Sequence, residues 1–305
     1  MLVQLLIFGP IKTMKFSTTL LFALSFFTSL AQNDTLIINS NTTTSITAAT
    51  SITDDTRLNN EVYKINNKID IPLTIATTAY TLYGFSKIYG RDQTPESVIL
   101  ALNKENVNSF DRRVTGYRDL KAKDASDKLF YGSMPLPLIF LLDKEMRKDG
   151  FKLGLLYLQA VSSFGSLYAT SAQIADRFRP YTYNPNENLG KRKGGGGRNS
   201  FFAGHPGMVA TVTFFSAKIY SDYHPNMKGK WILYTVAGAA AVTTGLLRVK
   251  AGEHFYSDIM VGIPVGVATG ILVPHFHRNK NRNQKLTVLP TYKSHQPGIY
   301  ASLKL

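Results

Sequence analysis

Six apolar segments of helix length constrain the fold of this chain more than any other feature of its sequence. A helix of about 20 apolar residues is long enough to cross a membrane. The segments are residues 71–89, 129–142, 153–174, 208–223, 231–247 and 259–276. The second contains Pro135 and Pro137 and is too short to cross a membrane unaided. We therefore predict an all-α fold, a membrane-associated bundle of six helices over residues 69–278.

The N-terminal residues have the pattern of a secretory signal peptide. Met14 and Lys15 precede an apolar run over residues 20–30, and the small residue Ala31 follows it. We expect residues 1–31 to be a signal peptide with Met14 as the true start, and hence export of the chain. An uncleaved anchor helix is the alternative.

Residues 32–68 and 279–305 lack the apolar runs of the middle of the chain. Thr, Ser and Asn dominate the first of these segments, so it is expected to be a flexible linker that buries no core. The second is a basic tail, in which Leu286, Val288 and, further on, Ile299 alternate with other residues. This alternation predicts a short hairpin.

The net charge narrows the class of partner. A formal charge of +15 at pH 7 predicts that the protein binds an anionic partner, which can be nucleic acid, anionic lipid head groups or a phosphorylated substrate. No zinc-finger spacing, aromatic RNA-binding signature or basic DNA-reading helix is visible, which disfavours nucleic acid. The chain has no cysteine, which excludes disulfides, thiolate metal sites and cysteine nucleophiles.

Residues 248–258 carry the clearest chemical pattern. His254 and Asp258 are four residues apart, so at the start of a helix they share one face. The carboxylate of Asp258 is expected to accept the proton of one imidazole nitrogen and leave the other nitrogen free to attack. Arg248 lies six residues before His254 and can bring a guanidinium to an oxyanion. The same residues would also suit an ordinary helix end with solvated charges.

Two further stretches lie at predicted helix ends. Pro180 ends a helix at Arg179, which either binds an anion or only complements the helix dipole. Gly204 lets the backbone approach a ligand, with His205 beside it, although this stretch also suits an ordinary helix-entry turn. Two histidines, two arginines and one aspartate match phosphoryl transfer through a phosphohistidine, in which one histidine attacks and the other protonates the leaving oxygen.

Over residues 71–277, these stretches resemble the motifs of the type 2 phosphatidic acid phosphatase superfamily. Those motifs are K-x6-R-P, P-S-G-H and S-R-x5-H-x3-D, and the family shares its fold with vanadium haloperoxidases and bacterial acid phosphatases. The resemblance implies that His254 is the nucleophile, His205 the general acid and Asp258 the residue that orients His254. The phosphate-binding groups that it implies are Arg179, Arg248 and the backbone of Gly204 and Ala203.

The chain departs from the family motifs at several positions. Ala172 stands where the family has lysine, Phe202 and Ala203 replace the Pro-Ser pair, and Leu247 replaces serine. A lost hydroxyl bond to a charged phosphate costs on the order of 1.5–3 kcal/mol, and the missing ammonium is the larger loss. Lys191 and Lys193 lie in a glycine-rich loop between the first two motifs and are expected to replace it.

The resemblance implies an exported, membrane-associated phosphatase that hydrolyses a lipid or isoprenoid phosphate monoester or diphosphate. No metal and no cofactor is expected. A haloperoxidase is disfavoured because the absent lysine should be costly for holding vanadate. The sequence is also compatible with a soluble periplasmic acid phosphatase of low specificity, or with a catalytically weakened homologue that binds anionic lipid.

The apolar segments also predict sidedness. Residues 71–89 and 153–174 are long enough to cross a membrane before Arg179, and residues 129–142 are not. If a cleaved signal leaves the N-terminus outside, two crossings place the three motifs outside as well. Residues 90–150, rich in Lys and Arg, would lie inside, as the positive-inside tendency favours. We expect the active site on the periplasmic or extracellular side.

Overall fold

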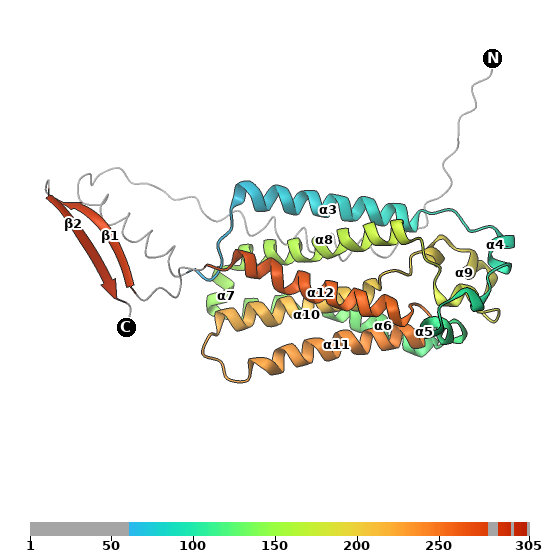
Figure 1. Ribbon diagram of the computed structural model, residues 1–305. Helices are drawn as coiled ribbons and strands as arrows, with labels where there is room; N and C mark the ends of the chain where they lie inside the picture. The colour runs from blue at the N-terminus through green and yellow to red at the C-terminus, as the bar shows by residue number, and fades with distance from the viewer. Residues whose placement is uncertain (1–60, 280–285, 294–295, 304–305) are drawn as a thin grey trace, which may run out of the picture. The chain divides into compact units, whose positions relative to one another are not determined.

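The computed structural model describes residues 61–279, 286–293 and 296–303. Residues 61–279 are helical, as predicted, and six of their helices are long (Figure 1). These are α3 (Asn67–Tyr89), α6 (Leu120–Ser133), α8 (Gly150–Ala175), α10 (Gly204–Tyr223), α11 (Lys230–Lys250) and α12 (Tyr256–His277). The predicted signal peptide, residues 1–31, lies outside the described residues.

Short helices fill the connections between the long ones. Several begin at a side-chain cap: the carboxylate of Asp143 accepts from the amide of Glu145 at 2.8 Å, and Asn188 accepts from Lys191 at 3.2 Å. The short elements are α4 (Glu96–Leu100), η1 (Lys104–Asn106), α5 (Ser109–Arg112), η2 (Arg113–Gly116), η3 (Leu136–Leu142), α7 (Lys144–Lys148), η4 (Pro180–Tyr183), α9 (Leu189–Lys193) and η5 (Gly195–Arg198).

The second predicted helix is displaced toward the N-terminus. The apolar run 129–142 predicts one helix, but α6 begins at Leu120 and ends at Ser133. Asp119 caps its start by accepting from the amide of Ala122 at 2.9 Å. Pro135 and Pro137 lack the amide protons that an α-helix needs, and the chain continues as the 3-10 helix η3. Apolar length alone therefore misplaced this helix.

The helices α3 and α8 run in the same direction, which contradicts the predicted two crossings. Thr77 contacts Ser162, and the Cα of Gly84 lies so close to Ala169 that a Cβ there would clash. Both helices end at one end of the bundle, where Arg91 pairs with Asp176 at 3.0 Å. The chain between them must therefore return along the bundle.

The return path is α6 followed by η3. Asp119, just before α6, pairs with Lys250 at 3.2 Å, at the end of the bundle where α3 and α8 stop. Phe140 of η3 packs with Met146 and Tyr223 at the opposite end. Three segments thus traverse the bundle before Arg179, because a 3-10 helix extends the short apolar segment. The two-crossing prediction is wrong.

The helices α10 and α12 approach each other very closely. A Cβ at Gly266 would lie 2.0 Å from the carbonyl oxygen of Gly207, and one at Gly262 would lie 2.4 Å from the carbonyl oxygen of Ala203. Only glycine permits this contact between backbones. The first turns of α10 and α12, which carry two of the three motifs, are therefore held side by side.

The ordered bundle begins earlier in the chain than predicted. Val62 and Tyr63 lie in the predicted linker, residues 32–68, yet both are buried. The hydroxyl of Tyr63 donates to Asp222 at 2.7 Å, and the amide of Asn279 donates to the carbonyl of Val62 at 2.9 Å. An aromatic ring and a buried carboxylate partner make this segment part of the core. The rest of that linker, residues 32–60, lies outside the described residues.

The C-terminal tail contains an antiparallel pair of strands. The strand β1 (Leu286–Lys293) pairs with β2 (Gln296–Leu303), with Leu286 opposite Leu303 and Lys293 opposite Gln296. These strands occupy the part of the chain for which alternation predicts a hairpin.

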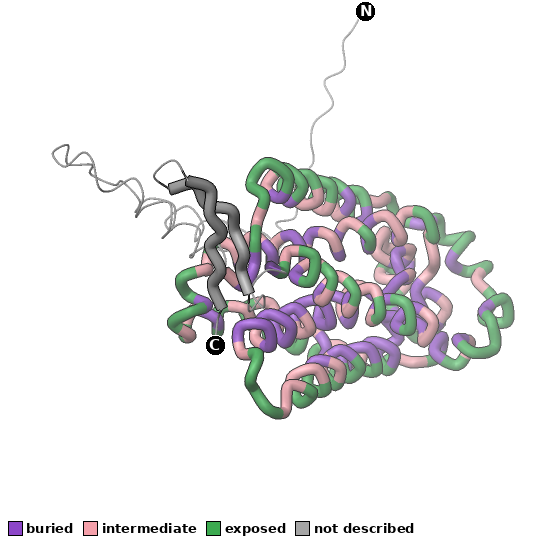
Figure 2. The backbone as a smooth tube through the Cα atoms, turned by 60° about the vertical axis from the view of Figure 1, so that its left-hand side comes forward, coloured by how far each residue is buried: buried purple, intermediate pink, exposed green. Residues whose placement is uncertain are grey.

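Many large apolar residues of the bundle are exposed. Figure 2 shows exposed positions, in green, along the outer helices. By length and composition, α11 and α12 are long and apolar enough to cross a membrane. Exposed apolar residues also lie on helices that fail this test, and they include Ile69, Ile75 and Tyr83 of α3, Leu138 of η3, and Leu167 and Ile174 of α8. Exposed apolar surface on this scale marks contact with a membrane or a partner. The bundle is membrane-associated.

Candidate active site

The three motif stretches meet at the end of the bundle where α4, α5 and α9 lie (Figure 1). Backbone hydrogen bonds join them. The amide of Tyr181 donates to the carbonyl of Gly252 at 3.0 Å, and the amide of Ala203 donates to the carbonyl of Asp258 at 3.0 Å. The amide of Arg179 donates to Gly197 at 2.8 Å. Every predicted site residue except Lys193 lies in or against this region.

The imidazole of His254 is the most enclosed group of the site, with 1% of its surface exposed. Its Nδ1 lies 2.8 Å from the backbone carbonyl of Ser200. Since a carbonyl only accepts, Nδ1 carries the proton and Nε2 carries the free electron pair. Nε2 is buried and has no hydrogen-bond partner among the described residues. This is the tautomer that a nucleophilic histidine needs.

The surroundings of His254 keep its ring neutral. Burial lowers the pKa of His254 well below its usual value of 6.5, and the guanidinium groups of Arg179 and Arg248 lower it further. At neutral pH the electron pair on Nε2 is therefore available for attack.

Asp258 orients His254 indirectly, which corrects the prediction of a direct contact. Its Oδ2 lies 3.7 Å from Nδ1 of His254, too far for a hydrogen bond. The same oxygen accepts from the hydroxyl of Ser200 at 2.6 Å and from the amide of Phe255 at 2.8 Å. Asp258 thus holds Ser200, whose carbonyl holds His254. Four-residue spacing placed the two side chains on one face but could not show that Ser200 lies between them.

Arg177 anchors Asp258 from the other side, a role that the sequence analysis missed. Its Nη1 donates to Oδ1 of Asp258 at 2.6 Å, and its Nη2 donates to Asp111 at 2.8 Å. The guanidinium also lies over the ring of Phe255, 4.3 Å from its centroid. The only signal in the sequence was its position beside Arg179.

Arg179 and Arg248 meet at the carboxylate of Glu253. Nη1 of Arg179 donates to Oε2 of Glu253 at 2.8 Å, and Nη2 of Arg248 lies 3.7 Å from the same oxygen. Nε of Arg179 is held by Asn199 at 2.7 Å. Nη1 of Arg248 donates to Asp127 at 2.7 Å. The two predicted arginines are therefore brought together, with partners that the sequence analysis did not identify.

Arg248 retains an unused donor. Its side chain is almost completely buried, and its Nε has no hydrogen-bond partner among the described residues. An unpaired buried donor on a guanidinium costs free energy unless an anion or water satisfies it. Together with Nε2 of His254, it indicates where an anion would bind.

His205 stands in the first turn of α10 and is more accessible than His254, with a quarter of its side chain exposed. Its ring lies against that of Phe130 in α6, with centroids 4.4 Å apart. Its Nε2 lies 3.5 Å from Oδ1 of Asp127, the oxygen that also accepts from Arg248. Burial and the guanidinium of Arg248 lower the pKa of His205 well below its usual value of 6.5, so Asp127 alone does not keep the ring protonated. A negatively charged substrate bound beside the ring would favour the protonated form that a general acid needs.

The structure separates the two predicted backbone donors. The amide of Ala203 donates to the carbonyl of Asp258 at 3.0 Å, so the prediction that Ala203 binds phosphate is wrong for this amide. Gly204 is the first residue of α10, where amides lack partners within the helix. A Cβ at Gly204 would lie 3.0 Å from the ring of Tyr168, so a larger residue would crowd this ring.

Of the two loop lysines, only Lys191 reaches the site. Its Nζ lies 2.9 Å from Glu187 and 3.6 Å from Oε1 of Glu253. Lys193 instead pairs with Glu96 of α4 at 3.1 Å. Ala172, at the family lysine position, is fully buried in an apolar cluster.

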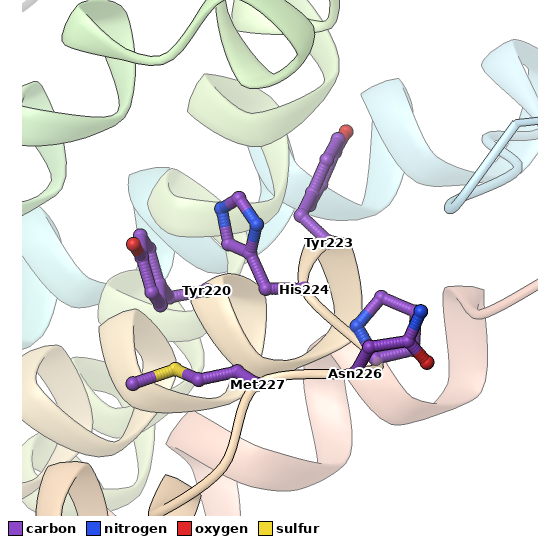
Figure 3. Close-up of a pocket in the computed structure, with 6 residues that line it drawn as sticks. Tyr220, Tyr223, His224, Asn226 and Met227 are labelled. Carbon is purple, nitrogen blue, oxygen red and sulfur yellow. The ribbon is translucent and has the colours of Figure 1, made fainter.

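Two other features lie apart from this chemistry. Within residues 61–279, no three His, Asp or Glu side chains are arranged to hold a metal ion. An open pocket of about 420 Å³ lies at the opposite end of the bundle, after α10, lined by Tyr220, Tyr223, His224, Pro225, Asn226 and Met227 (Figure 3). None of the predicted site residues lines it.

The comparison with family models agrees with the motif analysis. Residues 153–282 match the family model of the PAP2 superfamily, and this range contains all three motifs. Among solved structures, the chain is similar to the first transmembrane PAP2 type phosphatidylglycerolphosphate phosphatase from Bacillus subtilis, at 22% identity and a TM-score of 0.43. That match covers 67% of this chain and 94% of the other. No curated protein matches the chain.

Proposed function

We propose that the chain, whose residues 153–282 match the PAP2 superfamily model, is a phosphoric ester hydrolase that releases phosphate from a lipid or isoprenoid phosphate. The substrate is a monoester or diphosphate, and the intermediate is a phosphohistidine at His254. The observation that carries this proposal is the buried Nε2 of His254, which has no hydrogen-bond partner among the described residues and lies near the buried arginines. The other ring nitrogen, Nδ1, is bonded to the carbonyl of Ser200.

In the first step, Nε2 of His254 attacks phosphorus and a nitrogen–phosphorus bond forms. The bond from phosphorus to the leaving oxygen breaks, and protonated His205 gives that oxygen its proton. In the second step, neutral His205 takes a proton from a water molecule whose oxygen attacks phosphorus. The nitrogen–phosphorus bond breaks, phosphate leaves, and both histidines return to their starting states.

The cations stabilise the negative charge that spreads over the phosphate oxygens. Arg248 offers its unused Nε, Arg179 is aligned beside it through Glu253, and the amide of Gly204 adds a donor at a helix start. Lys191 takes the place of the family lysine, since it reaches the same carboxylate as the two arginines. The attack by His254 requires its ring proton to be on Nδ1, and the carbonyl of Ser200 holds the proton there.

A lipid or isoprenoid leaving group fits the surroundings of His205. The general acid marks the side on which the leaving oxygen lies. On that side, α6 presents Phe130 against His205, and Tyr131 packs against Phe130 with centroids 5.1 Å apart. Tyr131 is half exposed, at 53%. An apolar chain emerging from the phosphate would lie along these rings, next to the apolar outer surface of the bundle.

The test is phosphate release by the purified protein in detergent micelles. Substrates would be a long-chain alkyl phosphate, an isoprenyl diphosphate and glycerol phosphate, with the His254→Ala variant as the control. We expect release from the two apolar substrates, much less from glycerol phosphate, and none above background from the variant. Equal rates on all three would favour an acid phosphatase of low specificity. Binding of lipid vesicles without any release would favour a non-catalytic lipid-binding protein.

We also propose that the site faces the outside of the cell, with residue 67 on the inner side. The connection between η3 and α8 carries Lys144, Arg147 and Lys148, and that between α10 and α11 carries Lys228. Both lie at the end opposite the site. The connection between α3 and α6, at the site end, is basic as well and contains Arg91, Lys104, Arg112, Arg113 and Arg118. The positive-inside tendency therefore does not choose between the two ends, and the proposal rests on the predicted export of the chain. A cleaved signal peptide would leave residue 67 outside. Residue 67 and the site lie at opposite ends of the bundle, so if all six segments cross the membrane, a cleaved signal peptide would put the site inside.

Single cysteines at opposite ends of the bundle test this orientation in the cysteine-free chain. Asn186 lies at the site end and Asn226 at the opposite end, and both are exposed. With an impermeant maleimide on intact cells, we expect labelling of Asn186→Cys alone. Labelling of Asn226→Cys alone would put the site inside. Labelling of both would mean that the bundle does not cross the membrane, and labelling of neither before lysis would contradict an outward site.

A further inference from the structure

Glu253 is a buried carboxylate surrounded by three cations, and it takes no part in the proton and phosphoryl transfers proposed for His205 and His254. It is 5% exposed and immediately precedes His254. Its Oε2 lies 2.8 Å from Nη1 of Arg179 and 3.7 Å from Nη2 of Arg248. Its Oε1 lies 3.6 Å from Nζ of Lys191. Each cation comes from a different segment of the chain.

The backbone of Glu253 joins the same groups. Its amide donates to the carbonyl of Arg248 at 2.9 Å, and its carbonyl accepts from Nη1 of Arg179 at 3.2 Å. Both the backbone and the side chain of Glu253 are therefore held in place. Burial by itself would raise the pKa of Glu253, but Arg179, Arg248 and Lys191 outweigh burial and lower it to about 2. The side chain is ionised throughout the range in which proteins function.

Glu253 leaves two donors or acceptors of the site unused. Nε2 of His254 and Nε of Arg248 have no hydrogen-bond partner among the described residues, so both can contact an anion while Glu253 holds Nη1 of Arg179. Two guanidinium groups and an ammonium would otherwise repel one another before a substrate arrives. The same three cations would also retain the dianionic product after hydrolysis.

We propose that Glu253 is a positioning residue that holds Arg179 and Arg248 side by side and limits how tightly the site retains product phosphate. The carboxylate aligns one guanidinium of the pair directly and neutralises one of the three positive charges. This inference deepens the proposed function and rests on it. It predicts that the ionised carboxylate weakens phosphate binding while it raises the rate of the chemical steps.

The test combines two measurements on Glu253→Gln, which keeps the side-chain size and removes the charge. Binding of inorganic phosphate to the purified protein is measured by calorimetry, and turnover is measured with a long-chain alkyl phosphate. We expect phosphate to bind about 10-fold more tightly, since one neutralising charge is lost near two guanidinium groups. We expect kcat to fall by about 10-fold, because alignment of Arg179 is lost. A merely structural role would weaken both.

Two further variants distinguish the effect of the charge of Glu253 from the effect of its side-chain length and from that of any buried carboxylate near Lys191. Glu253→Asp keeps the charge on a shorter side chain, so kcat should fall while phosphate affinity stays within about twofold. Glu187→Gln is the matched control, since Glu187 is equally buried and bonds Lys191 at 2.9 Å but contacts neither arginine. Its phosphate affinity should stay within about twofold of the wild-type value.

The binding measurement does not depend on turnover, so it distinguishes failure of this inference from failure of the proposed function. Tighter phosphate binding in Glu253→Gln alone supports the inference even if no ester is hydrolysed. Unchanged or weaker binding in a folded Glu253→Gln protein would overturn it. Equal tightening in Glu187→Gln would overturn it too, since the effect would then belong to any carboxylate near Lys191.

Discussion

The two ends of the bundle each contain a His–Asp pair, and only one of them is arranged for catalysis. At the end opposite the site, His277 uses both ring nitrogens: Nδ1 lies 2.7 Å from the carbonyl of Val273, and Nε2 lies 3.0 Å from Asp70. At the site, Nδ1 of His254 is held by Ser200 while Nε2 is free. The presence of a His–Asp pair therefore does not identify a nucleophile. A buried nitrogen without a hydrogen bond does not identify one by itself either, because Nε2 of His224 at the far end is another, 3.3 Å from Asp143. What distinguishes His254 is that its unbonded Nε2 lies beside the buried arginines Arg179 and Arg248.

The charges around the two histidines differ in the same way. At the far end, Asp222 accepts from Tyr63 and pairs with Lys218, and Arg278 lies 3.6 Å from it. These charges are paired with one another and hold the segment before α3 against α10. At the site, Arg179 and Arg248 both approach Glu253, and Arg248 also pairs with Asp127 at 2.7 Å but keeps an unused donor at Nε. An unused donor on a buried guanidinium suits an anionic substrate.

Replacing His254 and His277 in turn should give the largest difference in activity between the two ends of the bundle. His254→Asn keeps a donor that can reach Ser200 but removes Nε2, and we expect phosphate release to fall by about 10⁴-fold or more. His277→Ala should leave kcat within about threefold and lower thermal stability, because Asp70 loses a buried partner. Phosphate release and thermal unfolding in detergent are the measurements. Comparable losses of activity in both variants would contradict the distinction drawn between the two ends.

The next effect concerns the general acid. His205→Ala should slow cleavage of an alkyl phosphate by about 10²–10⁴-fold, because the alkoxide leaving group is strongly basic. A nitrophenyl phosphate, whose leaving group needs no proton, should be slowed far less. Single-turnover rates for the two substrates measure the difference. Equal losses on both would remove His205 from this role.

A third prediction uses the low pKa of Glu253. With a value near 4.5 in the unfolded chain and about 2 in the folded protein, the ionised group stabilises the fold by about 3 kcal/mol above pH 4.5. This contribution is lost as pH falls from 4.5 through 2. The difference in free energy of unfolding between the wild type and Glu253→Gln should therefore shrink over that range. A difference that stays constant down to pH 2 would contradict the proposed cluster of charges.

The smallest effect separates the two loop lysines. Lys191→Ala should raise KM for a phosphate ester by about 10-fold, since it removes a partly exposed cation within reach of the site. Lys193→Ala should change KM by less than about twofold, because Lys193 pairs with Glu96 away from the site. Steady-state kinetics on both variants decide between them. A larger effect for Lys193 would mean that the loop is arranged differently when substrate is bound.

Much of the helical bundle could be predicted from apolar length, and its path could not. The long apolar segments became helices near their predicted positions. α6 was misplaced because its first half, from Leu120, is charged and amphipathic and its last apolar residues follow Pro135. The number of traverses depends on that segment, so the predicted path of two crossings before Arg179 was wrong. The side of the membrane on which the site lies stays a prediction. Close packing of glycines between α10 and α12 was also invisible without the partner helix.

The site residues divide in a similar way. That His254, His205, Arg179 and Arg248 lie together was predictable because each stands in a motif with fixed spacing, and their roles stay predictions. The predicted helix end at Arg179 was wrong, because α8 ends at Ala175. The residues that hold these four side chains come from segments far apart in the chain, and no periodic pattern or spacing links them. They are Ser200 behind His254, Asp127 beside His205 and Arg248, Glu253 between the arginines, and Arg177 behind Asp258.

The most direct test is to trap the covalent intermediate. The purified protein is mixed with a phosphate ester labelled in its phosphoryl group, quenched within milliseconds in alkali, which preserves phosphohistidine, and digested for peptide mapping. We expect label on the peptide that contains His254, bonded through Nε2, and none in the His254→Asn variant. Label on another residue, or no label while the same preparation turns over substrate, would contradict His254 as the nucleophile.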